Sequence, residues 1–442
     1  MRPTRTAASL LLVLAALTGR TAAASPPLVR CGVALDREVL YAGPSQRVVI
    51  KVSLDAPPAP RAGERPPINL AVVLDRSGSM AGDKIEKARE AAIEALRRLG
   101  PRDLFSLVAY DHEVDTVVPA QSAGRTEWIE GQIRSVGSRG NTALFGGVSQ
   151  GAAEVRKNAH RPYVNRVILL SDGLANVGPS SPSDLGRLGA ALRKEGISVS
   201  TVGVGTDFNE DLMTRLAEKS DGYHYFVESS RDLPRIFAQE LGDLLSVVAR
   251  GVVVEIECAR GVRPVRIIGR EGRISGDRVE VHLNQLYGGQ GKYVLVEVEV
   301  PAGRPDAALD LAVARCSYEN ALSQRAETSS ASARARFSTR AEDVRRSANR
   351  TVQQSVVDNE MAGARDQALD LYNAGKSREA AQELRRASEA LQEKNAELGF
   401  QDLSGQAAEL DKDAGAFESQ QVDNLRKKEI RSDSYKVRSQ RR

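Results

Sequence analysis

Three oxygen-bearing side chains lie together in one short polar stretch of the sequence. Asp75, Ser77 and Ser79 follow one another at alternate positions. Carboxylate and hydroxyl oxygens are hard ligands that suit Mg²⁺ or Mn²⁺ better than zinc. One acid and two hydroxyls do not fill an octahedral site, so further ligands must come from elsewhere in the chain.

The segments on either side place this stretch at a corner between a strand and a helix. Residues 69–74 form a continuous apolar run, typical of a strand buried on both faces, and apolar residues recur at helical spacing from Ile85 to Leu99. Gly100 and Pro101 then end the helix. The polar stretch is therefore predicted at the carboxyl end of a strand, where open α/β sheets bind ligands.

Two later corners offer the missing ligands. Thr142 lies where a glycine-containing loop leads into an apolar helix, and Asp172 follows an apolar run that ends in Ser171. Either residue alone has an ordinary explanation, because threonine often caps a helix and a Ser-Asp-Gly sequence often forms a turn. Together with the first stretch they predict one divalent-metal site. Its ligands are Asp75, Ser77, Ser79, Thr142 and Asp172.

In this order, the five residues resemble the metal-ion-dependent adhesion site of the von Willebrand factor type A domain, and none of them departs from that pattern. The resemblance implies a bound Mg²⁺ (or Mn²⁺) that stays electron-poor, because at least one acid in such sites acts through water. It also implies a partner protein that offers an Asp or Glu carboxylate to the metal. It does not identify that partner.

The wider pattern predicts an α/β domain inserted in a β-sandwich. Strands and helices alternate over residues 68–249, which indicates a doubly wound, mostly parallel sheet. Two strand-like runs precede this region in residues 25–60, five follow in residues 250–338, and a proline-rich linker covers residues 61–67. Two unrelated β segments are the alternative interpretation. The split arrangement also resembles bacterial secreted proteins with a type A domain and, more distantly, the inter-alpha-trypsin inhibitor heavy chains.

The last hundred residues are predicted to be helical and then basic. Two apolar stripes at helical spacing, broken at Gly375, predict an α-helical hairpin over residues 339–410. Residues 411–442 carry many lysines and arginines, and we predict a solvated, disordered tail there. Peripheral contact of this tail with an anionic membrane surface, or with an acidic partner, is the alternative.

The composition and the N-terminal residues indicate the cellular compartment in which the protein is expected to work. The 442 residues, 41% hydrophobic and 27% charged, are typical of globular proteins. Arg2 and Arg5 precede an apolar run and a small-residue cleavage site, so residues 1–24 are predicted to be a signal peptide of an exported (periplasmic, cell-surface or extracellular) protein. Its removal deletes three arginines and no acid, so the formal charge of +4 becomes about +1. That charge predicts no nucleic-acid partner.

The three cysteines suit an oxidising compartment, in which one pair forms a bridge and one thiol is left over. We predict Cys258 and Cys316 as the pair, with Cys31 unpaired. A cysteine metal site is not expected, because no two of the three lie within a few residues of each other.

These observations favour a non-enzymatic protein that binds its partner through the metal. A scaffold whose metal only stabilises the loops is the second interpretation. A metal-dependent phosphohydrolase is the third, but the sequence offers no convincing general base, since Asp111 and His112 are better explained by a hairpin turn. There is no phosphate-binding GxxxxGK[ST] motif, and Ser77 and Ser79 have no histidine partner in a recognisable motif. The oligomeric state stays open.

Overall fold

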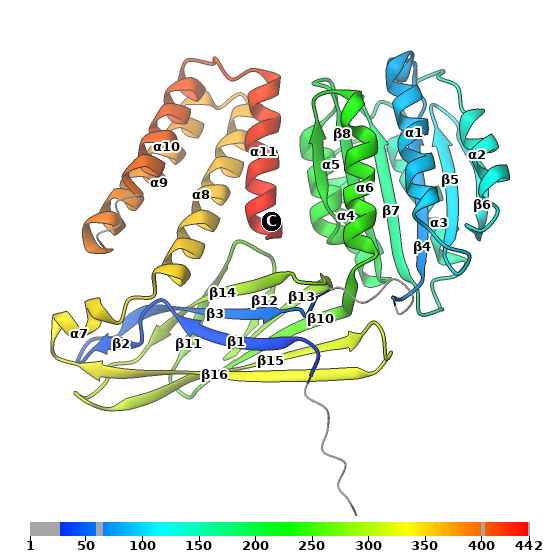
Figure 1. The fold of residues 1–442 in the computed structure, drawn as a ribbon. Coiled ribbons are helices and arrows are strands. Elements are labelled where there is room, and N and C mark those ends of the chain that lie inside the picture. Colours follow the sequence, from blue (N-terminus) through cyan, green and yellow to red (C-terminus); the bar gives the residue numbers. More distant parts are fainter. Residues whose placement is uncertain (1–26, 59–64, 399–402, 441–442) are drawn as a thin grey trace, which may run out of the picture.

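The computed structural model describes residues 27–58, 65–398 and 403–440. The chain is divided into a β-sandwich, an α/β domain inserted into it, and a group of C-terminal helices (Figure 1). The predicted signal peptide, residues 1–24, lies outside the described residues, and so does most of the predicted linker.

The α/β domain is built on one six-stranded sheet. Its strands are β4 (Ile68–Asp75), β5 (Leu104–Tyr110), β6 (Val114–Ser122), β7 (Val164–Ser171), β8 (Ile197–Val204) and β9 (His224–Val227). They lie in the order β6-β5-β4-β7-β8-β9, and only β6 runs antiparallel to its neighbour. The continuous apolar runs of β4 and β7 are buried along their whole length, as helices cover both faces of a parallel sheet.

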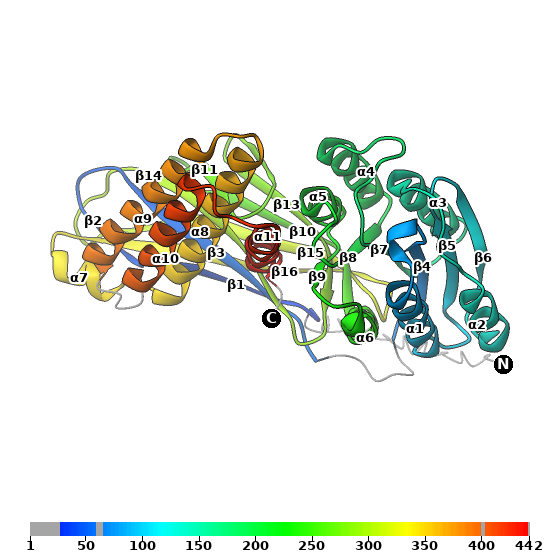
Figure 2. The ribbon, with the colours of Figure 1, turned by 90° about the horizontal axis from the view of Figure 1, so that it is seen from above.

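Helices cover the two faces in two layers, which Figure 2 shows on either side of the sheet. One layer consists of α1 (Asp83–Arg97), α2 (Thr126–Arg134) and α6 (Leu233–Leu244), and the other of α3 (Leu144–Arg156), α4 (Pro182–Lys194) and α5 (Glu210–Ser220). Two short 3₁₀ turns, η1 (Gly78–Met80) and η2 (Ser230–Asp232), complete the domain. The predicted doubly wound α/β fold is thus confirmed.

Two details of this domain differ from the prediction. Helix α4 was not anticipated, although Ser181 forms a capping box at its start and Pro182 occupies its first position. The alternation of strands and helices was predicted to continue to residue 249, but the last helix of the domain, α6, ends at Leu244. Val247 already begins strand β10, because its β-branched run pairs with β13 and β15 of the sandwich.

The sandwich combines strands from before and after the inserted domain. Its four-stranded sheet has the order β1 (Arg30–Leu35), β3 (Gln46–Asp55), β14 (Gly291–Val300), β11 (Arg263–Ile268). Its six-stranded sheet has the order β12 (Arg273–Ser275), β13 (Arg278–Tyr287), β10 (Val247–Cys258), β15 (Ala308–Asn320), β16 (Ala326–Ser338), β2 (Val39–Tyr41). Since β3 pairs with β14 and β2 with β16, the two β segments share one core, and the alternative of unrelated segments is wrong.

Strands β2, β12 and β16 were not among the seven predicted. Strand β16 is the instructive case, because its buried face consists of Ala333, Ala335 and Phe337, and the rest is mostly serine, alanine and arginine. Alanine has a weak preference for strands, so the alternation carries little sequence signal. The strand forms because β15 pairs with it over almost its whole length.

The predicted Cys258–Cys316 bridge is wrong. On the neighbouring strands β10 and β15, Cys316 lies opposite Val254, and Cys258 lies opposite Ala312, so the two cysteines are four positions apart along the ladder. That separation is far greater than a disulfide spans. The Cys316 thiol instead donates a hydrogen bond to Cys31 Sγ at 2.7 Å, and all three cysteines are free thiols.

In the described part of the chain, five helices follow the sandwich: α7 (Ala341–Arg346), α8 (Arg350–Asn373), α9 (Ser377–Leu398), α10 (Leu403–Glu418) and α11 (Asn424–Ser439). Helices α8, α9 and α10 share an apolar core that contains Leu384, Leu410 and Phe417. The predicted hairpin is therefore part of a larger helical group. Among the described helices, none is both long and apolar enough to cross a bilayer.

The predicted disordered tail is wrong for residues 411–440, because they complete α10 and form α11, which lies between α8 and α5 (Figure 1). The Lys428 ammonium donates to Glu210 Oε2 at 2.9 Å, and the Arg431 guanidinium pairs with Asp366 at 2.9 Å and with Asp370 at 2.6 Å. Both basic side chains are buried, so they are not free to meet a membrane surface. Arg441 and Arg442 lie outside the described residues.

His224 of β9 is buried beside α11, and its Nδ1 lies 2.9 Å from Thr201 Oγ1. Burial, reinforced by the positive charges of Arg431, Lys428 and Lys436, lowers the pKa of His224 to about 3. The ring is therefore neutral in the folded protein at pH values where an unfolded histidine is already charged.

We expect this histidine to make stability fall as the pH is lowered from 6.5 towards 3. Over that range the histidine of the unfolded chain binds a proton, whereas the buried ring stays neutral. The contribution of His224 to the free energy of unfolding is therefore fully present above pH 6.5 and decreases below it. The loss is about 2 kcal/mol at pH 5. In urea unfolding, the difference in the free energy of unfolding between pH 7.5 and pH 5 should be smaller in His224→Gln than in the wild type, by about 2 kcal/mol. Identical pH effects in the two proteins would contradict a neutral, buried ring.

Candidate metal site

The candidate site is a corner at the carboxyl end of the central strands β4 and β7. The chain continues from β4 to β5 on one side of β4, and it later adds β7 on the other side. The strand order therefore changes direction between β4 and β7, and in such sheets ligands bind at this switch point. Backbone hydrogen bonds join the first two loops here. Gly78 N–H donates to the Gly140 carbonyl at 3.0 Å, and Arg139 N–H donates to the Arg76 carbonyl at 2.6 Å.

Asp75, the last residue of β4, is held in a fixed position. Its Oδ1 accepts the Ser77 N–H at 2.8 Å, and its Oδ2 accepts the Ser171 hydroxyl at 2.6 Å and the Tyr110 hydroxyl at 3.4 Å. Burial raises the pKa of Asp75, the hydrogen bonds from Ser171 and Ser77 oppose this shift, and the charge of Asp172 adds to it. A buried carboxylate beside a second acid favours a bound cation.

The two serines and the second acid form a chain of contacts at the same corner. Ser77 Oγ lies 3.1 Å from Ser79 Oγ, and the Ser79 hydroxyl donates to Asp172 Oδ1 at 2.7 Å. The Lys84 ammonium, from the start of α1, donates to the other oxygen of Asp172 at 2.5 Å. A lysine therefore supplies the positive charge that this acid requires.

Thr142, the fifth predicted ligand, lies beside Gly173 and therefore close to the other four. A Cβ atom on Gly173 would lie 3.4 Å from Ser79 Oγ and 3.7 Å from Thr142 Oγ1, so the two hydroxyls border the same space next to Asp172. The Thr142 side chain makes no hydrogen bond with any described residue. Its backbone is fixed because Asn176 Oδ1 accepts the Thr142 N–H at 2.8 Å.

The structure therefore brings all five residues of the predicted site together. The residues that position them were missed, namely Ser171, Tyr110, Asn176 and Lys84. Ser171 and Lys84 lie close in sequence to predicted ligands, but each contacts a ligand about ninety positions away, for which the sequence carries no signal.

The residues present fit a hard divalent cation. Every donor is a carboxylate or hydroxyl oxygen, both acids are buried, and the hydroxyl of Thr142 has no described partner. The ammonium of Lys84 already occupies one oxygen of Asp172, so a cation would have to share this acid with it. Oxygen-only donor sets with two acids are typical of sites for hard divalent cations.

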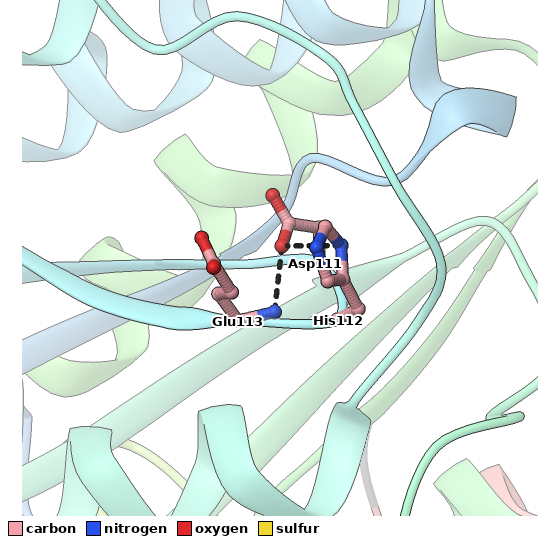
Figure 3. A group of neighbouring side chains, drawn as sticks. All are labelled: Asp111, His112 and Glu113. Atoms are coloured by element: carbon pink, nitrogen blue, oxygen red, sulfur yellow. Dashed lines mark hydrogen bonds and ion pairs between the residues drawn. The ribbon is translucent and has the colours of Figure 1, made fainter.

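A neighbouring group, Asp111, His112 and Glu113, also brings potential metal ligands within 4.8 Å of one another (Figure 3). Here the geometry favours a turn. Asp111 Oδ1 accepts the Glu113 N–H at 2.7 Å, and Oδ2 accepts Arg76 at 2.8 Å and Arg139 at 2.7 Å. Burial tends to raise the pKa of Asp111, but the hydrogen bonds from Glu113 and the two arginines hold it below its ordinary value. Two guanidinium groups on this carboxylate oppose a further cation.

The comparisons with known proteins decide the family of this domain. Residues 69–239 match the model of the von Willebrand factor type A domain. The chain contains a type A domain. Proteins with such a domain commonly use it for metal-dependent protein–protein interactions, and most of them are not enzymes. The resemblance predicted from the five site residues is thus confirmed at the level of the family.

Relatives of the type A domain include bacterial and animal proteins. The chain is 27% identical over 272 residues to the uncharacterized protein YfbK of Escherichia coli, covering 60% of this chain and 47% of that protein. It is 27% identical to human inter-alpha-trypsin inhibitor heavy chain H4, covering 43% of this chain and 22% of that one. The chain thus spans less than half the length of these curated relatives.

Two solved structures share the fold over most of the chain. A von Willebrand factor type A protein from Catenulispora acidiphila is 19% identical, with a TM-score of 0.66, and the match covers 84% of this chain and 88% of that one. The ArnB paralog VWA2 from Sulfolobus acidocaldarius is 18% identical, with a TM-score of 0.61, and the match covers 93% and 98%. At this identity the likeness concerns the fold alone.

Proposed function

We propose that the type A domain binds a partner protein through a divalent cation, Mg²⁺ or Mn²⁺, that captures an Asp or Glu carboxylate of that partner. The observation that carries the proposal is the convergence of five oxygen donors from three loops at one corner of the sheet. Asp75 and Asp172 would hold the ion, and Ser77, Ser79 and Thr142 would add neutral donors. When bound, the ion would supply an open position for one more anionic oxygen.

The chain's own residues prepare this corner. Ser171 and Tyr110 hold the carboxylate of Asp75 in place through hydrogen bonds, so little side-chain freedom remains to be lost on binding. The corner also has open access, because Ser79 is exposed and the sandwich joins the domain where β4 begins and where α6 leads into β10. Both connections lie at the opposite end of the sheet from the site. A partner can therefore reach the metal without displacing another part of the chain.

A non-catalytic role is part of the proposal. His112 lies beside Gly140 of the second loop, and its Nδ1 lies 3.2 Å from Asp111 Oδ1, in the turn that Asp111 organises. The proposal also places the protein outside the cytoplasm, and the support for that is the N-terminal sequence of residues 1–24 alone.

The function is tested by selecting binding peptides from a random library with the immobilised full chain in Mg²⁺. We expect the selected peptides to share an Asp or Glu whose replacement by Asn or Gln abolishes binding, and we expect chelator to release them. Thr142→Val is the matched variant, because it keeps the shape of the side chain and removes one donor without breaking a described hydrogen bond. It should bind the peptides at least tenfold more weakly.

The outcomes separate the rival functions. Peptide binding that persists in chelator and in Thr142→Val would contradict metal-bridged binding. If chelator only lowers the melting temperature and leaves peptide affinity unchanged, the metal is structural, and the binding surface lies elsewhere on the chain.

A further inference from the structure

A small cavity lies where the type A domain, the sandwich and helix α11 meet. Helix α11 packs against α5 beside it, and Figure 2 shows the two helices as neighbours. The volume of the cavity is about 60 Å³, several times the ~10–15 Å³ that one water requires. Charged side chains from all three parts line it. They are Arg193, Glu218 and Asp221 of the type A domain, Arg270, Glu271, His282 and Lys292 of the sandwich, and Arg438 of α11.

Lys292 is the most unusual of these side chains. It belongs to β14 and is only 5% exposed, yet its ammonium makes no hydrogen bond or ion pair with any described residue. Burial lowers the pKa of Lys292, Asp221 opposes the shift, and Arg270 and Arg166 reinforce it. The ammonium borders the cavity and has no acceptor among the described residues, so a group that accepts its hydrogen bonds fits there.

Two of the three acids that line the cavity already form ion pairs with other side chains. Glu218 pairs with Arg438 at 3.1 Å, and Glu271 pairs with Lys219. Only Asp221 remains, and its Oδ2 accepts the backbone N–H of Asn284.

The positive charges are in excess. Arg270 makes one described hydrogen bond, to the Arg438 carbonyl at 3.3 Å, and Arg193 forms no ion pair with a described residue. Arg193, Arg270 and Lys292 thus face a single free acid, Asp221. With Arg438, Glu218 and Glu271 included, the lining has four cationic and three acidic side chains, so the cavity keeps a positive surplus that an oxyanion would offset.

We propose that this cavity binds a small inorganic oxyanion of the phosphate or sulfate class, held by Lys292, Arg270 and Arg193. Guanidinium and ammonium groups together are the usual protein ligands of such anions, and charge-assisted hydrogen bonds are the strong ones. Because the walls come from three parts of the chain, the bound anion joins α11 and the sandwich to the type A domain. The site is separate from the metal corner and does not depend on it.

The test compares inorganic phosphate with chloride at equal ionic strength, in thermal unfolding and in isothermal titration of the full chain. We expect phosphate to raise the melting temperature in a saturable way, because a ligand that binds only the folded state stabilises it. In Lys292→Met the phosphate effect should vanish and the titrated affinity should fall at least tenfold. In chloride this variant should melt at or above the wild-type temperature, because it has lost a buried, unpartnered charge.

Two further variants keep the test decisive. Lys194→Met removes an exposed lysine next to Arg193 in sequence and should respond to phosphate as the wild type does. Arg193→Gln changes a half-buried side chain and should weaken phosphate binding even if Lys292→Met does not fold. Equal melting temperatures in phosphate and chloride for the wild type, or an undiminished phosphate response in both cavity variants, would overturn the proposal and leave a water-filled cavity.

Discussion

Asp172→Asn is expected to abolish saturable Mg²⁺ binding by the full chain while leaving it folded. The substitution keeps the shape of the side chain and removes one of the two negative charges of the site. Asp172 accepts only the Ser79 hydroxyl and the Lys84 ammonium, so no described backbone hydrogen bond is lost. Changes to residues that merely support metal ligands cost about 10- to 100-fold in affinity, and loss of a charged ligand should cost at least about 100-fold.

Isothermal titration of Mg²⁺ and Mn²⁺ measures this effect, with circular dichroism as the check on folding. Lys84→Met is the informative companion, because the Lys84 ammonium occupies one oxygen of Asp172 and competes with the metal for it. This variant should bind Mg²⁺ more tightly than the wild type. An unchanged Mg²⁺ affinity in Asp172→Asn would show that the ion binds elsewhere.

Arg166→Met is expected to cause the largest loss of stability. Arg166 of β7 is fully buried, and its guanidinium lies 3.3 Å from Glu240 Oε1 of α6. The same group donates to Gln285 at 3.0 Å and to Tyr287 at 2.5 Å, both on β13 of the sandwich. Methionine would leave Glu240 buried without its counter-charge and would remove the two hydrogen bonds from Arg166 to the sandwich. Breaking a buried pair in this way costs about 3–5 kcal/mol.

Urea unfolding is the measurement, and the double variant Arg166→Met with Glu240→Gln is the control. Removing both charges should restore part of the lost stability, because an uncharged amide leaves no unpaired charge behind. The recovery is incomplete because Glu240 Oε1 and Oε2 accept the Ser200 and Tyr225 hydroxyls, and the amide that replaces the carboxylate keeps only one of these acceptors. A single variant as stable as the wild type, or a double variant no better than the single one, would contradict a stabilising role for the pair.

The features that could be predicted from the sequence are those that depend on the pattern of neighbouring residues. The apolar run of β4, the repeat of α1 and the polar corner between them are each visible within some thirty residues, and parallel strands bring their carboxyl ends to one edge. Because Asp75, Thr142 and Asp172 each follow a recognisable strand end or begin a helix, the candidate site could be assembled before any coordinates.

What the sequence did not predict depends on contacts between distant residues. The basic residues of α11 looked like a solvated tail because their acidic partners, such as Asp211 and Asp366, lie far away in the chain. The contact between the Sγ atoms of Cys31 and Cys316 was not predicted, because nothing local reveals that β1 lies against β15. The excess charge around Lys292 likewise exists only where three parts of the chain meet.

The pairing of β3 with β14 determines the order in which the parts of the chain can form. Gln46 lies opposite Val300 and Asp55 opposite Gly291, so β3 has no central partner until the ribosome has passed the whole inserted domain. The type A domain makes its sheet contacts among its own strands and can fold as soon as α6 has emerged. Contacts between distant residues form slowly, and separate domains fold as units. The sandwich contains β1, the first of the described strands, but it must wait for β14 before its core can form.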